Sequence, residues 1–233
     1  MIINDSEGIM AERIVVITGA SGGLGGAVTD AFLKKGDVVY GVSRSGGDLT
    51  AEKFHAVAAD LTSSKVAREV MSHIVRTTKR IDVLVHVLGG FDGGKTVPDT
   101  TDETWSKMLA LNLSAAFYVF RAAIPYIPAG GRIVAIGSRA GVLPSAGLSA
   151  YSVSKAGLNS LVLTIAEELK DKRVTANVIL PSTIDTPANR EWGSPEQQAK
   201  WVKAESIAAQ VLWLASPEAG DVSGALIPVY GRA

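Results

Sequence analysis

Short apolar runs alternate with longer helical patterns along the whole 233-residue chain. Seven runs rich in β-branched residues lie at 13–18, 38–42, 55–59, 81–88, 132–136, 175–180 and 225–229. Most are apolar without strict alternation, which is typical of strands buried on both faces of a parallel sheet. The segments between them predict helices, chiefly at 25–35, 63–77, 102–127, 151–170 and 205–215. We therefore expect βαβ units with right-handed crossovers, forming one doubly wound α/β domain of about seven strands over residues 13–233, with helices on both faces.

The composition excludes several kinds of site. The chain has no cysteine, which excludes disulfides, Cys-ligated zinc, iron–sulfur clusters and thiol catalysis, and its three histidines lack a zinc-hydrolase spacing. Its 23 basic and 23 acidic residues cancel, so nothing in the net charge favours nucleic acid or an anionic membrane. No apolar run approaches the roughly 18 residues of a membrane span. Residues 1–12 form an N-terminal arm with acids ahead of any apolar stretch, unlike a signal peptide, and we expect a cytoplasmic protein.

A glycine cluster at 19–26 follows the first predicted strand and opens the first predicted helix. Glycines there let the backbone turn sharply and approach a pyrophosphate, whose charge then lies at the helix N-terminus. This position favours dinucleotide binding over a merely flexible turn. The candidate cofactor contacts in the loop are Gly19, Ser21, Gly23, Leu24 and Gly25.

A second glycine-rich segment, 89–96, satisfies the phosphate-binding pattern GxxxxGK[ST]. A true P-loop needs its Lys-Thr pair to begin a helix whose N–H groups face the phosphates. Here Pro98 follows Thr96 closely and cannot continue the interior of such a helix. No apolar strand ends in an aspartate suited to magnesium, since the run at 132–137 ends in Ser138. We interpret the segment as a glycine-rich loop beside the cofactor cleft, with an NTPase as a remote alternative.

Ser138, Tyr151 and Lys155 together predict acid–base chemistry. The tyrosine and the lysine are four residues apart and share one helical face. A cation about 5 Å from the phenol, at an effective dielectric of about 20, contributes about 3 kcal/mol and lowers the phenol pKa by roughly two units. That brings the phenol nearer the range of a general acid–base catalyst. Ser138 ends a predicted strand, where the carboxyl ends of strands line the ligand crevice of an open α/β sheet.

The TGxxxGxG pattern of the glycine loop and this Ser-Tyr-Lys set resemble the short-chain dehydrogenase/reductase family over nearly the whole chain. The resemblance implies a Rossmann-like fold and a nicotinamide cofactor. It also implies that Tyr151 protonates the substrate carbonyl oxygen as hydride arrives, and that Ser138 hydrogen-bonds the same oxygen. Lys155 then lowers the tyrosine pKa and holds the nicotinamide ribose. Asn112 matches the family asparagine that supports a proton relay through water to the lysine.

Other positions match family cofactor contacts or depart from them. The matches are Asp60 and Leu61 beside the adenine (a helix N-cap being the alternative for Asp60), the Gly89 backbone, and Pro181, Ile184 and Thr186 around the carboxamide. Ser182 replaces the usual glycine after the proline, and 86–89 reads His-Val-Leu-Gly where the family has NNAG. The asparagine-based support of the central sheet therefore does not carry over, and we interpret His86 as a packed strand histidine.

The substrate is left open by the sequence. Segments 89–94 and 180–190 resemble dihydropteridine reductase, which implies that Phe91 and Trp192 stack on a flat heterocycle; loop aromatics anchoring a lid are the alternative. That enzyme type generally lacks a serine at position 138 and favours NADH, whereas a complete Ser-Tyr-Lys set favours carbonyl–alcohol interconversion, as in 3-oxoacyl-thioester reductases. Residues 182–203 are the expected substrate lid. A dinucleotide sensor that has lost catalysis is a further alternative, although it need not keep these residues.

The end of the second strand favours NADP(H) over NAD(H). NAD-specific members of this fold place an acid there to bind the ribose hydroxyls. Here Ser43, Arg44 and Ser45 follow the strand, with no carboxylate before Asp48, and the arginine offers a forked donor to a 2′-phosphate. Gly22 is the opposing signal, because many NADP-binding relatives carry a second basic residue in that part of the loop. The family resemblance also implies a homo-oligomer, most simply a tetramer, and an apolar stretch at 115–120 fits either that interface or the core.

Overall fold

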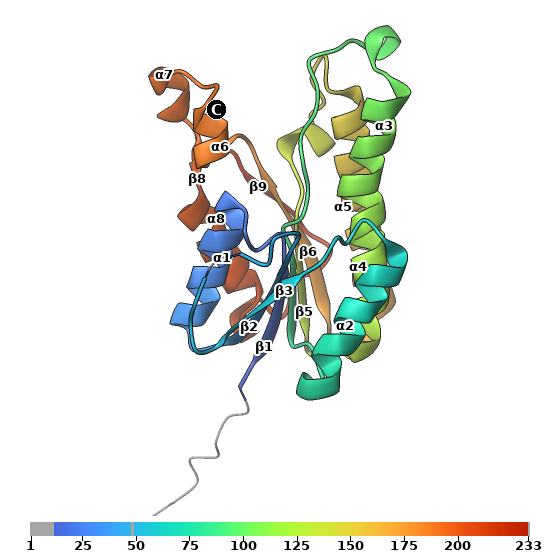
Figure 1. The fold of residues 1–233 in the computed structure, drawn as a ribbon, viewed down its shortest axis with the longest axis vertical. Helices are drawn as coiled ribbons and strands as arrows, with labels where there is room; N and C mark the ends of the chain where they lie inside the picture. The colour runs from blue at the N-terminus through green and yellow to red at the C-terminus, as the bar shows by residue number, and fades with distance from the viewer. Residues whose placement is uncertain (1–11, 48, 233) are drawn as a thin grey trace, which may run out of the picture.

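Seven parallel strands form one sheet in the order β3-β2-β1-β4-β5-β6-β9 (Figure 1). Their bounds are β1 Ile14–Thr18, β2 Val38–Ser43, β3 Phe54–Ala58, β4 Val83–His86, β5 Arg132–Ile136, β6 Thr175–Pro181 and β9 Leu226–Val229. The structure is a computed structural model that describes residues 12–47 and 49–232. The chain runs outward from β1 to β3 and then returns to place β4 on the other side of β1. This reversal is the topological switch point at which open α/β sheets bind ligands.

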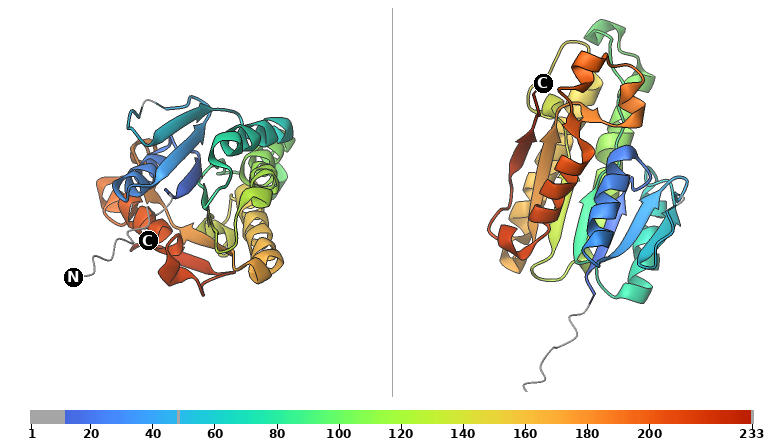
Figure 2. Two further views of the ribbon diagram at one scale, coloured as in Figure 1. Left: turned by 90° about the horizontal axis from the view of Figure 1, so that it is seen from below. Right: turned by 90° about the vertical axis from the view of Figure 1, so that its left-hand side faces the viewer.

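Helices cover both faces of the sheet (Figure 1). On one face α1 (Gly23–Lys34) and α8 (Ala204–Leu214) pack side by side, as the right-hand view of Figure 2 shows. On the other face lie α2 (Ser64–Thr78), α4 (Ala115–Ala123) and α5 (Ser149–Leu169). Each layer buries its own apolar cluster against the sheet, with Phe32 central to the first and Phe120 to the second. The predicted doubly wound α/β sheet is confirmed.

Two predicted strands, β3 and β9, are less buried than the rest. We expected most of the apolar runs to be buried on both faces, but in β3 His55, Ala56 and Ala58 are exposed. The reason is its position at the edge of the sheet, where it pairs with β2 alone. The other apolar runs lie between neighbours, except β9, which forms the opposite edge.

The predicted helix at 102–127 is a composite of four pieces. It consists of α3 (Asp102–Leu109), a π-helical segment (Ala110–Ser114), α4, and a 3-10 turn (Ile124–Tyr126) that contains a proline. By length and composition alone, the run Asp102–Tyr126 would suffice to cross a membrane, contrary to our expectation that no segment would. Its apolar side chains have a place within the fold, because Ala115, Ala116 and Val119 are buried in the core beside α2.

Small elements rise above the carboxyl ends of the strands on both sides (Figure 1). On one side is the loop that leads from β4 to α3. On the other are β7 (Ile184–Asp185), α6 (Pro187–Arg190), α7 (Pro195–Gln198) and β8 (Val202–Lys203). β7 and β8 pair in parallel, so the segment predicted as a lid carries its own small sheet. Of the arm predicted at 1–12, residues 1–11 lie outside the described residues.

Candidate active site

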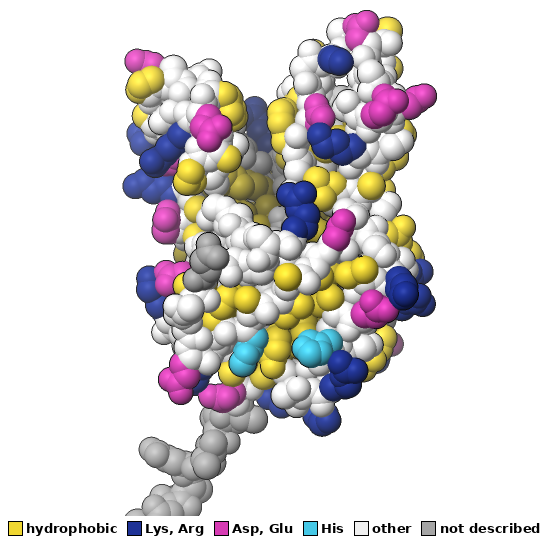
Figure 3. All heavy atoms as spheres, viewed as in Figure 1, with side chains coloured by type: hydrophobic (Ala, Val, Ile, Leu, Met, Phe, Trp, Pro, Cys, Tyr) yellow, Lys and Arg dark blue, Asp and Glu magenta, His cyan; other side chains and the backbone are white. Residues whose placement is uncertain are grey.

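A cavity of about 1540 Å³ opens at the carboxyl ends of the strands, between these two sets of elements. Figure 3 shows it as a hollow with hydrophobic side chains on both inner walls. Most of the residues predicted from the sequence line it: Gly19, Ser21, Leu24, Gly25, Ser43, Arg44, Asp60, Leu61, Gly89, Phe91, Ser138, Tyr151, Lys155, Pro181, Ile184 and Trp192. The fold therefore brings both predicted ends of a ligand site, nucleotide and reacting group, into one cavity.

The glycine loop is built so that a ligand can approach the backbone closely. Gly19 has φ +74°, and a Cβ there would lie 2.8 Å from the amide nitrogen of Leu88. A Cβ on Gly25 would lie 2.0 Å from the carbonyl oxygen of Gly19, so this turn accepts no side chain. Gly22 precedes α1 without a side-chain cap, which leaves the positive end of the helix to other partners. These features fit the pyrophosphate of a dinucleotide.

Two predicted cofactor contacts face each other in the structure. A Cβ on Gly23 would lie 3.0 Å from the Cβ and Cγ2 atoms of Thr186. The Thr186 hydroxyl accepts a hydrogen bond from the amide of Asn189 at 3.3 Å and caps α6. Thr186 therefore joins the start of the lid to the glycine loop, and the small size of Gly23 permits that contact.

Ser138 and Tyr151 meet at the centre of the cavity. Ser138 follows β5 and caps a 3-10 turn, with its hydroxyl accepting from the amide of Ala140 at 3.2 Å. Tyr151 lies in the first turn of α5, which begins two residues earlier than predicted. Burial raises the pKa of the Tyr151 phenol, and a hydrogen bond with the Ser138 side chain opposes that rise. The two hydroxyls are thus already paired.

Lys155 differs from expectation in its electrostatic effect. Its Nζ donates to the carbonyl oxygen of Ile136 at 2.9 Å in a buried position, and burial lowers its pKa to about 8. We expected the lysine to lower the pKa of Tyr151, but desolvation dominates and leaves that phenol pKa raised. The ammonium also lies close to the β4 loop, since a Cβ on Gly89 would lie 3.1 Å from it.

Asn112 lies behind the cavity, in the π-helical segment of the long helix. Its Oδ1 accepts from the amide of Gly90 at 2.9 Å, and its Nδ2 donates to the carbonyl of Gly90 at 3.0 Å and to the hydroxyl of Ser154 at 3.1 Å. The side chain therefore fixes the loop after β4 to the helix α5. A π-helical bulge inside an α-helix often marks a functional position. The sequence signal was a single asparagine within an apolar helix.

His86 is fully buried, as predicted for a packed strand histidine. Its Nδ1 is 2.9 Å from the hydroxyl of Thr18, which in turn accepts from the amide of Leu88 at 3.4 Å. The ring packs against Phe120, with centroids 5.3 Å apart. Burial, assisted by the charge of Lys155, lowers its pKa to about 3, so the imidazole is neutral at ordinary pH.

Arg44 and Asp60 lie near each other at the end of the cavity beside β2 and β3. Arg44 is exposed, whereas the Ser43 hydroxyl is buried and has no partner among the described residues. Asp60 accepts from the hydroxyl and amide of Thr62, at 2.7 and 3.0 Å. These bonds, and more weakly the Arg44 charge, hold the carboxyl pKa of Asp60 below its usual range. Ser63, not Asp60, caps α2, so the N-cap alternative for Asp60 is wrong; Asp48 lies outside the described residues.

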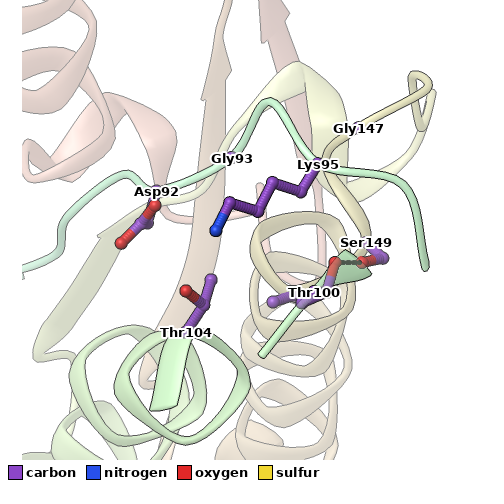
Figure 4. Close-up of a pocket in the computed structure, with 8 residues that line it drawn as sticks. Asp92, Gly93, Lys95, Thr100, Thr104, Gly147 and Ser149 are labelled. Atoms are coloured by element: carbon purple, nitrogen blue, oxygen red, sulfur yellow. Dashed lines mark hydrogen bonds between the residues drawn. The ribbon is translucent and has the colours of Figure 1, made fainter. Parts of the chain in front are cut away.

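The P-loop-like segment forms no nucleotide cradle. Its Lys-Thr pair precedes a 3-10 turn, Val97–Asp99, instead of an α-helix. Figure 4 shows the side chain of Lys95 extending to a point between Asp92 and Thr104. The pocket beside it measures about 10 Å³, space for about one water molecule. The interpretation as a loop beside the cleft is therefore the better one.

Several lining residues were not predicted from the sequence. They come from the loop after β5 and from the base of the lid: Arg139, Leu143, Ser145, Leu148, Ser182, Thr183 and Asn189. The position of Arg139 directly after Ser138 was the sequence feature that could have identified it. Its guanidinium lies over the ring of Tyr230, 5.3 Å from the ring centroid. Ser182, the departure from the family glycine, donates to the carbonyl of Tyr230 at 2.8 Å and so ties the lid base to the C-terminal segment.

Comparisons with known proteins agree with this geometry. The sequence model of the short chain dehydrogenases matches residues 13–197. The cyclic-di-GMP-binding biofilm dispersal mediator protein of Escherichia coli is 30% identical, with 96% of this chain and 98% of that protein covered. A 3-oxoacyl-[acyl-carrier-protein] reductase of Pseudomonas aeruginosa is 29% identical, with 94% and 96% covered. The crystal structure of a blue fluorescent protein from a metagenomic library, in complex with NADPH, has a TM-score of 0.84 at 26% identity, with 94% and 97% covered.

Proposed function

This chain belongs to the short-chain dehydrogenase/reductase family, and we propose that it is an NADP(H)-dependent oxidoreductase that interconverts a small ketone and a secondary alcohol. The observation that carries the proposal is the paired Ser138 and Tyr151, with Lys155 one helical turn away, in the same cavity as an uncapped glycine loop. When bound, the nicotinamide supplies or accepts the hydride. The protein's own residues bind the cofactor, orient the substrate and transfer the proton.

Each residue of the proposed set has a separate task. Tyr151 donates its phenolic proton to the carbonyl oxygen, and Ser138 holds that oxygen in line with the phenol. Lys155 holds the nicotinamide ribose, since its ammonium has three N–H donors and the carbonyl of Ile136 accepts one of them. The raised pKa of Tyr151 and the lowered pKa of Lys155 describe the ligand-free protein. Asn112 contributes by fixing the loop and helix that frame the relay to the lysine.

We propose a preference for NADP(H) on the basis of Arg44. Its exposed guanidinium lines the cavity where β2 ends, and no acid lies at that strand end among the described residues. The test is titration of NADPH and NADH against the unmodified protein and against Arg44→Ala, with Arg68→Ala, an exposed arginine on α2, as the matched control. We expect NADPH to bind more tightly, and Arg44→Ala alone to weaken it by about tenfold, or about 1.4 kcal/mol. Tighter NADH binding would contradict the proposal.

The alternatives are tested by turnover. A quinonoid dihydropterin substrate would favour the dihydropteridine-reductase-like alternative, to which Phe91 and Trp192 in the cavity lend support. A non-enzymatic dinucleotide sensor is the other alternative, and one relative is named for binding cyclic di-GMP. The decisive experiment follows NADPH absorbance across a panel of carbonyl compounds that includes the dihydropterin. Tight cofactor binding without turnover of any panel member would count against the oxidoreductase proposal.

We also propose a homotetramer, following the family resemblance. Of the apolar stretch at 115–120, Ala115, Ala116, Val119 and Phe120 are buried in the core, so core packing explains most of it. Phe117 is 42% exposed, and Val153 on the neighbouring helix α5 is 46% exposed. These two side chains are the ones that subunit association would cover.

A further inference from the structure

Two aromatic side chains stand exposed in the candidate active site. Phe91 is 66% exposed and Trp192 is 62% exposed, and both line the cavity. They come from opposite sides, Phe91 from the loop after β4 and Trp192 from the lid between α6 and α7. Leaving apolar surface in contact with water is unfavourable. Such side chains inside a cavity indicate surfaces that a ligand covers.

The loop that carries Phe91 is held on both sides of the ring. Before it, Gly90 is bound through both its amide and its carbonyl by Asn112. After it, Asp92 forms an ion pair with Lys107 at 3.0 Å. The phenyl ring itself lies edge-on to the ring of Tyr151, with centroids 5.0 Å apart. Phe91 is therefore a fixed surface beside the proposed proton donor.

Trp192 is held in a comparable way. Its indole packs on Trp201, with ring centroids 5.1 Å apart. Gly193 follows Trp192 in the chain, and a Cβ on it would lie 2.1 Å from the Trp201 ring, so Trp201 can lie there only beside a glycine. The amide of Trp192 also donates to the carbonyl of Asn189 at 3.3 Å. The indole is thus anchored on one face while its cavity side is exposed.

Apolar side chains line the same cavity as the two rings. Leu111, Leu143 and Leu148 line the same cavity, and Leu143 is 53% exposed. Among the described lining residues the one acidic side chain, Asp60, lies at the end of the cavity beside β2 and β3. A flat apolar group placed against Phe91 lies next to the phenol of Tyr151, so a carbonyl attached to that group is within its reach.

We propose that Phe91 and Trp192 determine specificity for a carbonyl compound whose carbonyl is attached to a flat apolar ring, an aryl ketone or aryl diketone, in preference to an open aliphatic chain. This inference rests on the proposed function. In this proposal the rings of Phe91 and Trp192 contact the substrate and not the cofactor.

The test compares two diketones that differ by the ring, 1-phenylpropane-1,2-dione and butane-2,3-dione, with NADPH. We expect a higher kcat/KM for the phenyl compound. Phe91→Leu and Trp192→Leu should each lower that value about tenfold through KM, while butane-2,3-dione changes less than twofold. Tyr126→Leu, a partly exposed aromatic in the 3-10 turn before β5, is the control and should change neither. Thermal melting establishes that each variant is folded. Equal preference for the two diketones, or an equal loss for both, would overturn the inference.

Binding separates this inference from the proposed function. If no member of the carbonyl panel, the two diketones included, is reduced although NADPH binds, the oxidoreductase proposal fails. The aromatic site is then measured by calorimetric titration of 2-naphthol, a flat compound without a reducible carbonyl, into the complex with NADP+. Binding that weakens about tenfold in Phe91→Leu and not in Tyr126→Leu supports the site, and absence of binding overturns it.

Discussion

The burial of Lys155 predicts that the ligand-free protein gains stability as the pH rises from 7 to 10. The side chain is buried, its Nζ donates to the carbonyl of Ile136, and its pKa falls from 10.5 to about 8. His86, the neighbouring titratable group on β4, has a pKa of about 3 and stays neutral throughout this range. The lysine is therefore the group in this part of the site whose charge changes.

The free energy of unfolding changes with pH because the folded and unfolded protein bind different numbers of protons. Between pH 8 and 10.5 the unfolded lysine binds more protons than the folded one, so the free energy of unfolding rises with pH. At about 1.4 kcal/mol for each unit, the shift from 10.5 to 8 amounts to about 3 kcal/mol, most of it recovered by pH 10. Above pH 10 the raised pKa of Tyr151 acts in the opposite direction, because the unfolded phenol loses its proton first.

The assay is urea unfolding at pH 7, 8, 9 and 10 for the unmodified protein and for Lys155→Met. We expect the stability of the unmodified protein relative to the variant to rise by roughly 2 kcal/mol across this range. Lys35→Met removes an exposed lysine and should keep the unmodified pH profile. A constant difference between the unmodified protein and Lys155→Met at all four pH values would contradict the lowered pKa of Lys155, since it would mean that burial costs the ammonium nothing.

Three further predictions concern the loop, the reaction and the assembly. Gly25→Ala should abolish NADPH binding, because its Cβ would lie 2.0 Å from the carbonyl oxygen of Gly19, whereas Gly26→Ala meets nothing within 4 Å and should bind normally in the same titration. Tyr151→Phe should keep its affinity for NADPH and lose at least a hundredfold in kcat, since it deletes the proton donor and little volume; a kcat near that of the unmodified protein would exclude the assigned role. Sedimentation at micromolar concentration should show a species about four times 24.3 kDa, and a lone monomer would end the tetramer proposal.

The sequence predicted the sheet well because its strands are buried. Strands such as β1 and β6 are buried along their whole length, and largely apolar runs without strict alternation are the pattern expected of such strands. The same pattern cannot say which strand lies at an edge, and β3 is exposed for that reason. The helix predicted at 102–127 keeps its boundaries to within one residue but is interrupted inside: Asn112 bonds to Gly90 across the fold, and this long-range contact accompanies a π-helical segment that no local propensity predicts.

The sequence predicted where the residues of the candidate site lie, but not how their surroundings change their pKa values. The spacing of Tyr151 and Lys155 placed both on one helical face, and the structure has them there. Their pKa directions depend on which groups surround each atom. Enclosure raises the pKa of the phenol and lowers that of the ammonium, because burial disfavours the charged form of each. The spacing of Tyr151 and Lys155 in the sequence predicts how the ammonium charge acts on the phenol pKa. It does not include the cost of burying both groups.

The chain departs from the family pattern at 86–89 and at Ser182, and in both places another contact ties the backbone segments together. At 86–89 the family asparagines are absent, yet His86 joins β4 to β1 through Thr18, whose hydroxyl also receives the amide of Leu88. After Pro181 the family glycine is absent, and the hydroxyl of Ser182 is bonded to the carbonyl of Tyr230. In both places a buried or half-buried polar side chain, His86 or Ser182, forms a hydrogen bond with a segment that is distant in the sequence. The active-site frame can therefore keep its geometry while its supporting residues change, because the fold requires that these backbone segments be tied together and does not require a particular side chain to tie them.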